Sequence, residues 1–143
     1  MKACNMTAAE YDYFEHDADI GISGRGATLE QAFENAARAM FAIMSDIAAL
    51  DNEICVRVDF EEEDVELALV TWLNLLLAYA RELQAVFGEF KLQRSGDIWR
   101  GTASGRHWNE HMERGVEVKG ATLTMLAVQQ TPDGWEARCI VDV

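Results

Sequence analysis

The chain has 143 residues, and half of them are apolar, which suits a sizeable hydrophobic core and excludes a disordered polypeptide. No apolar run reaches the ~18 residues needed to span a bilayer, so we expect a cytoplasmic protein without membrane segments. The net charge is −13, and the 12 basic residues are scattered. This charge disfavours direct nucleic-acid binding and favours cations or basic protein surfaces as partners.

The first strand-like segment contains the acidic stretch EHDADIG, residues 15–21. If the segment is extended, Asp17 and Asp19 point to one side and present two carboxylates together. Carboxylates are hard ligands suited to Ca²⁺, Mg²⁺ or Mn²⁺. Paired acids are also common as solvated charge in a chain with 25 acidic residues, so both interpretations stay open. His16 is interpreted as a structural, hydrogen-bonding histidine, because imidazole prefers softer metals.

Residues 28–44 predict an amphipathic helix with one apolar stripe, and Thr28 followed by Gln31 is a capping pattern at its start. Residues 53–60 alternate and predict a strand with one buried face. A second, largely apolar helix is expected to follow Asp64, which can cap it. The cysteines, Cys4, Cys55 and Cys139, are too far apart to predict a zinc or disulfide framework. Cys55 and Cys139 are expected to behave as small buried hydrophobes.

The second half of the chain has a β pattern. Residues 86–94 and 98–105 flank the turn signal Ser95-Gly96-Asp97, and residues 115–130 and 135–143 flank Thr131-Pro132-Asp133-Gly134. Two helices and mostly antiparallel strands predict an α+β fold, with residues 1–143 as a single layered domain. We expect residues 1–10 to be a flexible N-terminal segment.

Four segments, in order, resemble the archease family. These are YFEHDADIGISGRGATLEQAFENAARAMFAIMSD near the N-terminus, WLNLLL in the second helix, VEVKGATLTML, and the ending ARCIVDV. The similarity runs from about Tyr11 to Val143. The chain departs from the family pattern at five positions, which are Asp17, Leu75, Gly120, Leu123 and Thr124.

The resemblance implies a small accessory protein of RtcB-type RNA ligase, which joins 2′,3′-cyclic-phosphate or 3′-phosphate ends to 5′-hydroxyl ends using GTP and divalent metal. Archeases promote guanylylation of that ligase and its multiple turnover in tRNA splicing or RNA repair. By this resemblance the metal ligands are Asp19, Asp142 and the carbonyl of Val143, with Asp17 as a possible addition. Ca²⁺ is the expected ion, and Mg²⁺ or Mn²⁺ are alternatives.

The resemblance thus predicts an activator rather than an enzyme, reaching RNA indirectly through the ligase. Two other functions stay open: an independent metal-dependent phosphohydrolase or nucleotide-binding enzyme, and a chaperone-like binding module. The sequence shows no P-loop, nucleophile elbow or HExxH motif that would favour the enzyme.

Overall fold

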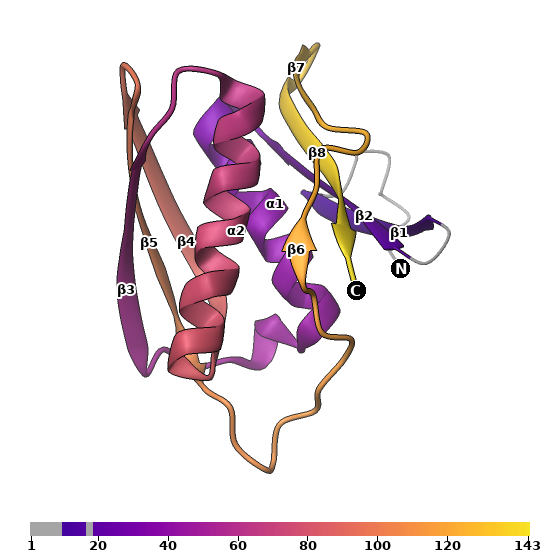
Figure 1. Ribbon diagram of the computed structural model, residues 1–143, viewed down its shortest axis with the longest axis vertical. Coiled ribbons are helices and arrows are strands. Elements are labelled where there is room, and N and C mark those ends of the chain that lie inside the picture. Colours follow the sequence, from indigo (N-terminus) through magenta and orange to yellow (C-terminus); the bar gives the residue numbers. More distant parts are fainter. Residues whose placement is uncertain (1–9, 17–18) are drawn as a thin grey trace.

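The computed structural model describes residues 10–16 and 19–143. Two helices lie between two antiparallel sheets, so the fold has three layers (Figure 1). This arrangement confirms the predicted α+β class. The expected flexible segment falls almost entirely outside the described residues, and so does Asp17. Neither helix in the described part of the chain is long and apolar enough to cross a membrane.

The larger sheet has five strands in the order β1-β2-β8-β6, with β7 also paired to β8. Its strands are β1 (Tyr11–His16), β2 (Asp19–Gly26), β6 (Gly120–Ala121), β7 (Ala127–Thr131) and β8 (Gly134–Asp142). The smaller sheet has the order β3-β5-β4. Its strands are β3 (Ile54–Glu61), β4 (Ala85–Ser95) and β5 (Ile98–His107). The helices are α1 (Leu29–Met44), α2 (Val65–Leu83) and the short 3₁₀ turn η2 (Ile47–Ala49).

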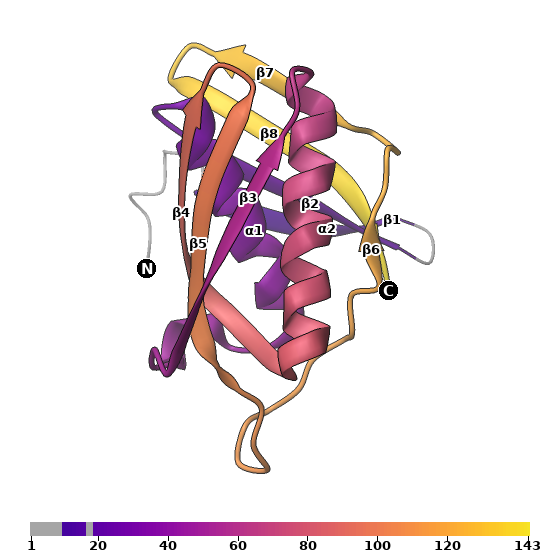
Figure 2. The same cartoon turned by 60° about the vertical axis from the view of Figure 1, so that its left-hand side comes forward.

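Helix α1 begins as predicted. The Thr28 hydroxyl accepts a hydrogen bond from the Gln31 amide at 3.1 Å, and the Gln31 side chain accepts one from the backbone of Ala27 at 2.9 Å. The buried surface is wider than the predicted stripe, since Ala39 and Ile43 are buried too. The reason is that α1 contacts both sheets (Figure 2). A Cβ on Gly24 of β2 would lie 2.1 Å from an α1 backbone nitrogen, so this close packing requires glycine.

Helix α2 is capped by Asp64, whose carboxylate accepts hydrogen bonds from two amides of the first turn. The indole nitrogen of Trp72 donates to the Phe33 carbonyl at 3.0 Å, which ties α2 to α1 inside the core. Around this bond the core is aromatic. Trp99 stacks on Phe33 at 5.2 Å between ring centroids and on Phe60 at 5.7 Å, joining β3, β5 and α1.

The two predicted hairpins form, with Gly96 and Gly134 at positive φ in their turns. The interpretation of residues 115–130 as continuous β structure is wrong, however. Strand β6 covers two residues, and residues 122–126 form a turn in which Met125 has a φ of 53°. The turn is held against β8 because the Thr122 hydroxyl donates to the Ile140 carbonyl at 2.8 Å.

The two described cysteines have different environments. Cys139 is 1% exposed, as expected, but Cys55 is exposed. The expectation for Cys55 is therefore wrong. Alternation along β3 places Val56 and Val58 on the inner face and Cys55 on the outer face.

Candidate functional site

Strands β2 and β8 bring the acidic motif near the N-terminus close to the last residues of the sequence. They pair antiparallel, with Ile20 opposite Val141 and Ile22 opposite Cys139. One further step in this register places Asp19, the first residue of β2, opposite Asp142, the last residue of β8. Directly opposed residues have their Cβ atoms about 4.5–5.5 Å apart, so the two carboxylates start from neighbouring positions.

Both carboxylates belong to the outer face of the five-stranded sheet. Ile22 and Val141 are fully buried in the core on the helix side. Because side chains alternate along a strand, Asp19 and Asp142 lie on the opposite side, away from the helices. Asp142 is exposed and Asp19 is partly exposed. Water and ions therefore reach this pair of acids without any movement of the core.

The end of the chain is anchored rather than free. The Lys119 amide donates to the Asp142 carbonyl at 2.8 Å, and the side chain of Val143 packs against the core. The neighbouring strand β6 is held in turn by Asn74 of α2. The Asn74 side chain accepts from the Ala121 amide at 2.9 Å and donates to its carbonyl at 3.2 Å. These contacts hold Asp142 and Val143 in place beside β6.

The oxygen atoms at this corner form a donor set that suits a hard cation. Asp19 and Asp142 carry side-chain carboxylates at neighbouring strand ends, and Val143, which follows Asp142, offers a main-chain carbonyl. Carboxylate and carbonyl oxygens are the ligands that Ca²⁺, Mg²⁺ and Mn²⁺ prefer. In residues 10–16 and 19–143, no group of three His, Cys, Asp or Glu side chains is close enough to hold an ion. A third ligand from the described chain would therefore be a main-chain oxygen.

The acidic motif includes the end of β1 and the start of β2. β1 ends at His16, β2 begins at Asp19, and the two strands run antiparallel with these residues opposite each other. The expectation that Asp17 and Asp19 point to one side stays a prediction. Asp17 itself lies outside the described residues. For His16 the backbone position is described, next to Asp19 in the sheet.

Sequence reasoning missed Asn74 and Lys119, which position the site without contributing a carboxylate. Asn74 carried a signal: it is an amide within the apolar run WLNLLL, and buried polar groups need hydrogen-bond partners. Lys119 carried none, because its backbone amide makes the bond and any residue except proline has one.

Comparison with known proteins shows which family the chain belongs to. The family model described as the Archease protein family matches residues 11–143. The chain belongs to the archease family. The match covers β2 and β8, whose paired ends with Asp19 and Asp142 are called the acidic corner below. It also covers the whole described core, so it extends far beyond a local motif.

Archease relatives of similar length are known from several archaea. An archease of Pyrococcus furiosus is 36% identical over 141 residues, covering 94% of this chain and 99% of its own. An archease of Methanosarcina acetivorans is 34% identical over 140 residues, covering 94% of this chain and 96% of its own.

Two solved structures share the archease fold. The solution structure of Methanobacterium thermoautotrophicum protein 1598 has a TM-score of 0.79 and 32% identity, covering 94% of this chain and 99% of its own. The crystal structure of a Thermotoga maritima archease, described there as a possible chaperone, has a TM-score of 0.63 and covers 91% of this chain and 94% of its own. At 19% identity, the second shows a common fold only.

Proposed function

We propose that this protein is an accessory factor that activates an RtcB-type RNA ligase in the cytoplasm, and that it works with a divalent cation held by Asp19, Asp142 and Val143. The proposal joins family membership to one observation, the register that sets Asp19 opposite Asp142 at an anchored chain end. In this role the ligase performs the covalent chemistry with GTP and RNA. The accessory protein promotes guanylylation of the ligase and repeated turnover.

The cation has a physical reason to be there. Two aspartates on adjacent strands repel one another when both are ionised. A bound cation removes that repulsion. Ca²⁺ fits best, because it accepts irregular arrangements of oxygen ligands, whereas Mg²⁺ demands near-ideal octahedral geometry. Mn²⁺ is the remaining candidate.

The metal site is tested by Asp19→Asn. This change removes one anionic ligand and keeps the shape of the side chain, so calorimetric titration should show weaker Ca²⁺ and Mn²⁺ binding. The melting temperature of the metal-free protein should not fall, because the change also relieves repulsion between the two carboxylates. Asp133→Asn is the matched control, since Asp133 is exposed and precedes β8 at the end far from Asp142. Equal affinity of Asp19→Asn and wild type would remove Asp19 from the site.

A chaperone-like role is a second candidate, and one observation favours it. Four of the large apolar side chains that are exposed lie on β1 and in the turn after β6; they are Tyr13, Phe14, Leu123 and Met125. If suppression of aggregation of unrelated proteins were the function, this protein would reduce light scattering of a heated client without ligase. We expect no such protection at equimolar concentration.

A further inference from the structure

A pocket of about 480 Å³ lies beneath the connection between β5 and β6, and Asp19, Asp142 and Val143 do not line it. This connection, residues 108–119, is here called the strap, and it runs along the bottom of Figure 1. The cavity beneath it is the strap pocket. Leu77, Ala85 and Val118 line its floor, and each is 2% exposed. The volume lies in the range of small-molecule sites in proteins.

The strap is fastened to the helix ends, so the strap pocket is preformed. The Gly115 amide donates to the Met44 carbonyl at 2.8 Å, and the Val116 amide donates to the Ile43 carbonyl at 3.1 Å. A Cβ on Gly115 would lie 2.2 Å from the Ile43 carbonyl oxygen, so glycine permits this contact. These bonds satisfy carbonyls in the last turn of α1 that would otherwise lack partners.

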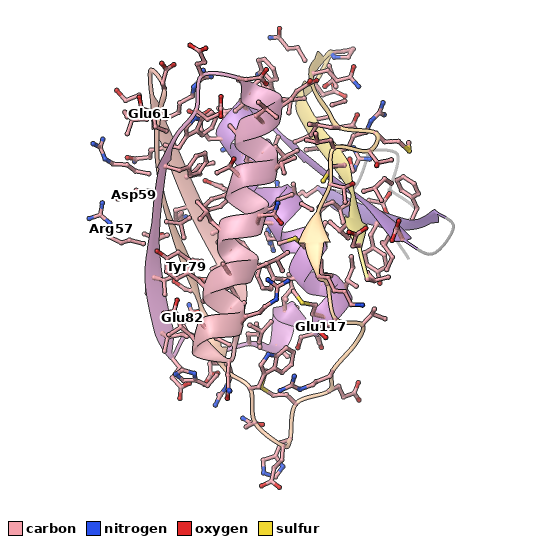
Figure 3. All side chains as sticks on the ribbon, in the orientation of Figure 1. Arg57, Asp59, Glu61, Tyr79, Glu82 and Glu117 are labelled. Carbon is pink, nitrogen blue, oxygen red and sulfur yellow. The ribbon has the colours of Figure 1, made fainter. Side chains whose placement is uncertain are left out.

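The rim of the strap pocket is chemically distinct from the rest of the surface. It carries two guanidinium groups, Arg81 and Arg114, and one carboxylate, Glu117. One positive charge is therefore in excess there, on a chain whose net charge is −13. Figure 3 shows Glu117 beside the last turns of α2, while Tyr79 and Glu82 lie on the other side of this helix, toward β3.

Both guanidinium groups keep free donors. Arg114 stacks on Trp108, with its central carbon 4.1 Å from the ring centroid, and makes no hydrogen bond or ion pair with any described residue. Arg81 uses one nitrogen, Nη2, to donate to the strap carbonyls of Val118 and Lys119. Its Nε and Nη1 have no partner in the described part of the chain. Glu117 is not within ion-pair distance of either arginine.

We propose that the strap pocket binds an apolar organic acid, whose hydrophobic part fills the floor and whose carboxylate is held by Arg114 and Arg81. Guanidinium groups bind carboxylates through paired, charge-assisted hydrogen bonds, and Trp108 offers an adjoining apolar wall. This chemistry occurs in free aromatic acids and at the C-terminus of a polypeptide that ends in an apolar residue. The inference does not depend on the proposed ligase function.

The first test is titration of the isotope-labelled full chain with 1-naphthoate, followed by two-dimensional NMR. We expect saturable shifts confined to the strap, the last turns of both helices and the Trp108 indole. The uncharged analogue 1-naphthylmethanol should bind about tenfold more weakly, because it lacks the charge-assisted bonds. Absence of saturable binding, shifts centred elsewhere, or equal affinity for the two probes would overturn the proposal.

The second test uses matched variants. Arg114→Gln should weaken 1-naphthoate binding about tenfold and leave 1-naphthylmethanol binding unchanged. Arg94→Gln is the control, because Arg94 also stacks on an indole, that of Trp99 at 4.8 Å, but does not line the pocket. Ala80→Leu should fill the pocket and reduce binding of both probes. Wild-type affinity in Arg114→Gln or in a folded Ala80→Leu would contradict the assignment.

A third test distinguishes a free small acid from a polypeptide C-terminus as the ligand. It uses a short peptide ending in phenylalanine, prepared as the free acid and as the amide. Binding of the free-acid peptide, with loss in the amide, would support a polypeptide C-terminus as the ligand. Binding of 1-naphthoate without the peptide would support a free small acid. Equal binding of the acid and amide peptides would contradict recognition of the carboxylate.

Discussion

Cys55 and Cys139 show how strongly one residue's position on a strand determines its chemistry. Both are unpaired cysteines in β strands, yet Cys55 is exposed and Cys139 is 1% exposed. Burial raises the pKa of the Cys139 thiol to about 12, whereas the backbone hydrogen bond with Thr122 acts in the opposite direction and is the smaller effect. Since the thiolate is the reactive species, Cys139 should be inert in the native protein.

Thiol labelling tests this difference. In a Cys4→Ser variant at pH 8, a disulfide reagent should modify one thiol rapidly, at Cys55, and the second thiol should react only after denaturant is added. A Cys55→Ser change in the same background should abolish the rapid phase. Rapid labelling of two thiols in the native state would show that β8 opens far more readily than its buried position implies.

Glu34 of α1 is a partly buried carboxyl group whose environment shifts its pKa. Desolvation by burial raises its pKa above the usual 4.5, although its hydrogen bond from the Leu92 amide, 2.8 Å long, lowers it. The folded state thus holds this proton more tightly than the unfolded chain does. Its contribution to stability is therefore fully present below the unfolded pKa and is lost as the pH rises through the folded pKa.

Glu34→Gln should consequently increase the free energy of unfolding at pH 7, because glutamine keeps an acceptor for Leu92 and carries no charge to desolvate. The advantage over wild type should shrink as the pH falls through the folded pKa of Glu34, and it should be lost below about 4, where Glu34 is protonated in both states. Urea unfolding of both proteins across this pH range measures the difference in the free energy of unfolding. Glu63→Gln, at an exposed position, controls for the change in net charge. A pH-independent difference would refute the assignment.

At the level of elements, sequence patterns correctly predicted the features that depend on residues close together in the chain. The capping residues Thr28 and Asp64, the alternation in β3 and the hairpin turns all depend on neighbours within a few residues. The break between β6 and β7 does not. Residues 122–126 leave the strand pattern because Thr122 bonds to Ile140, eighteen positions away. The extra buried face of α1 likewise results from contact with a second sheet. The periodicity of apolar residues along the helix does not predict this contact.

Leu73 tests the orientation of α2. It is fully buried, so Leu73→Ala should reduce the free energy of unfolding by about 2–5 kcal/mol. Leu67→Ala on the same helix is the matched control, because Leu67 is 43% exposed, and it should cost less than about 1 kcal/mol. Chemical denaturation of both variants measures the difference. Similar midpoints for the two would mean that the buried face of α2 is assigned wrongly.

At the level of the whole molecule, the acidic corner exists because of pairing between strands more than a hundred residues apart. Sequence reasoning could propose Asp19 and Asp142 through the family resemblance, but composition and spacing could not place β8 beside β2. Both strands pack against α1, a contact between elements far apart in the sequence. The anchoring of the chain end by Lys119 and Asn74 is equally a product of the assembled fold.

The central claim is that the last two residues are functional, so their removal is the most direct test. The measurement is the multiple-turnover rate of a purified RtcB-type ligase with GTP, Mn²⁺ and RNA ends, with wild-type protein or with a variant lacking Asp142 and Val143. A tag on Val143 and the same tag on Met1 provide the matched control, and a thermal melt verifies folding. We predict that the wild type accelerates turnover, and that with the folded truncated variant the ligase turns over at the same rate as without any accessory protein. The C-terminal tag should impair activation more than the N-terminal tag. Full activation by the truncated protein would contradict the account.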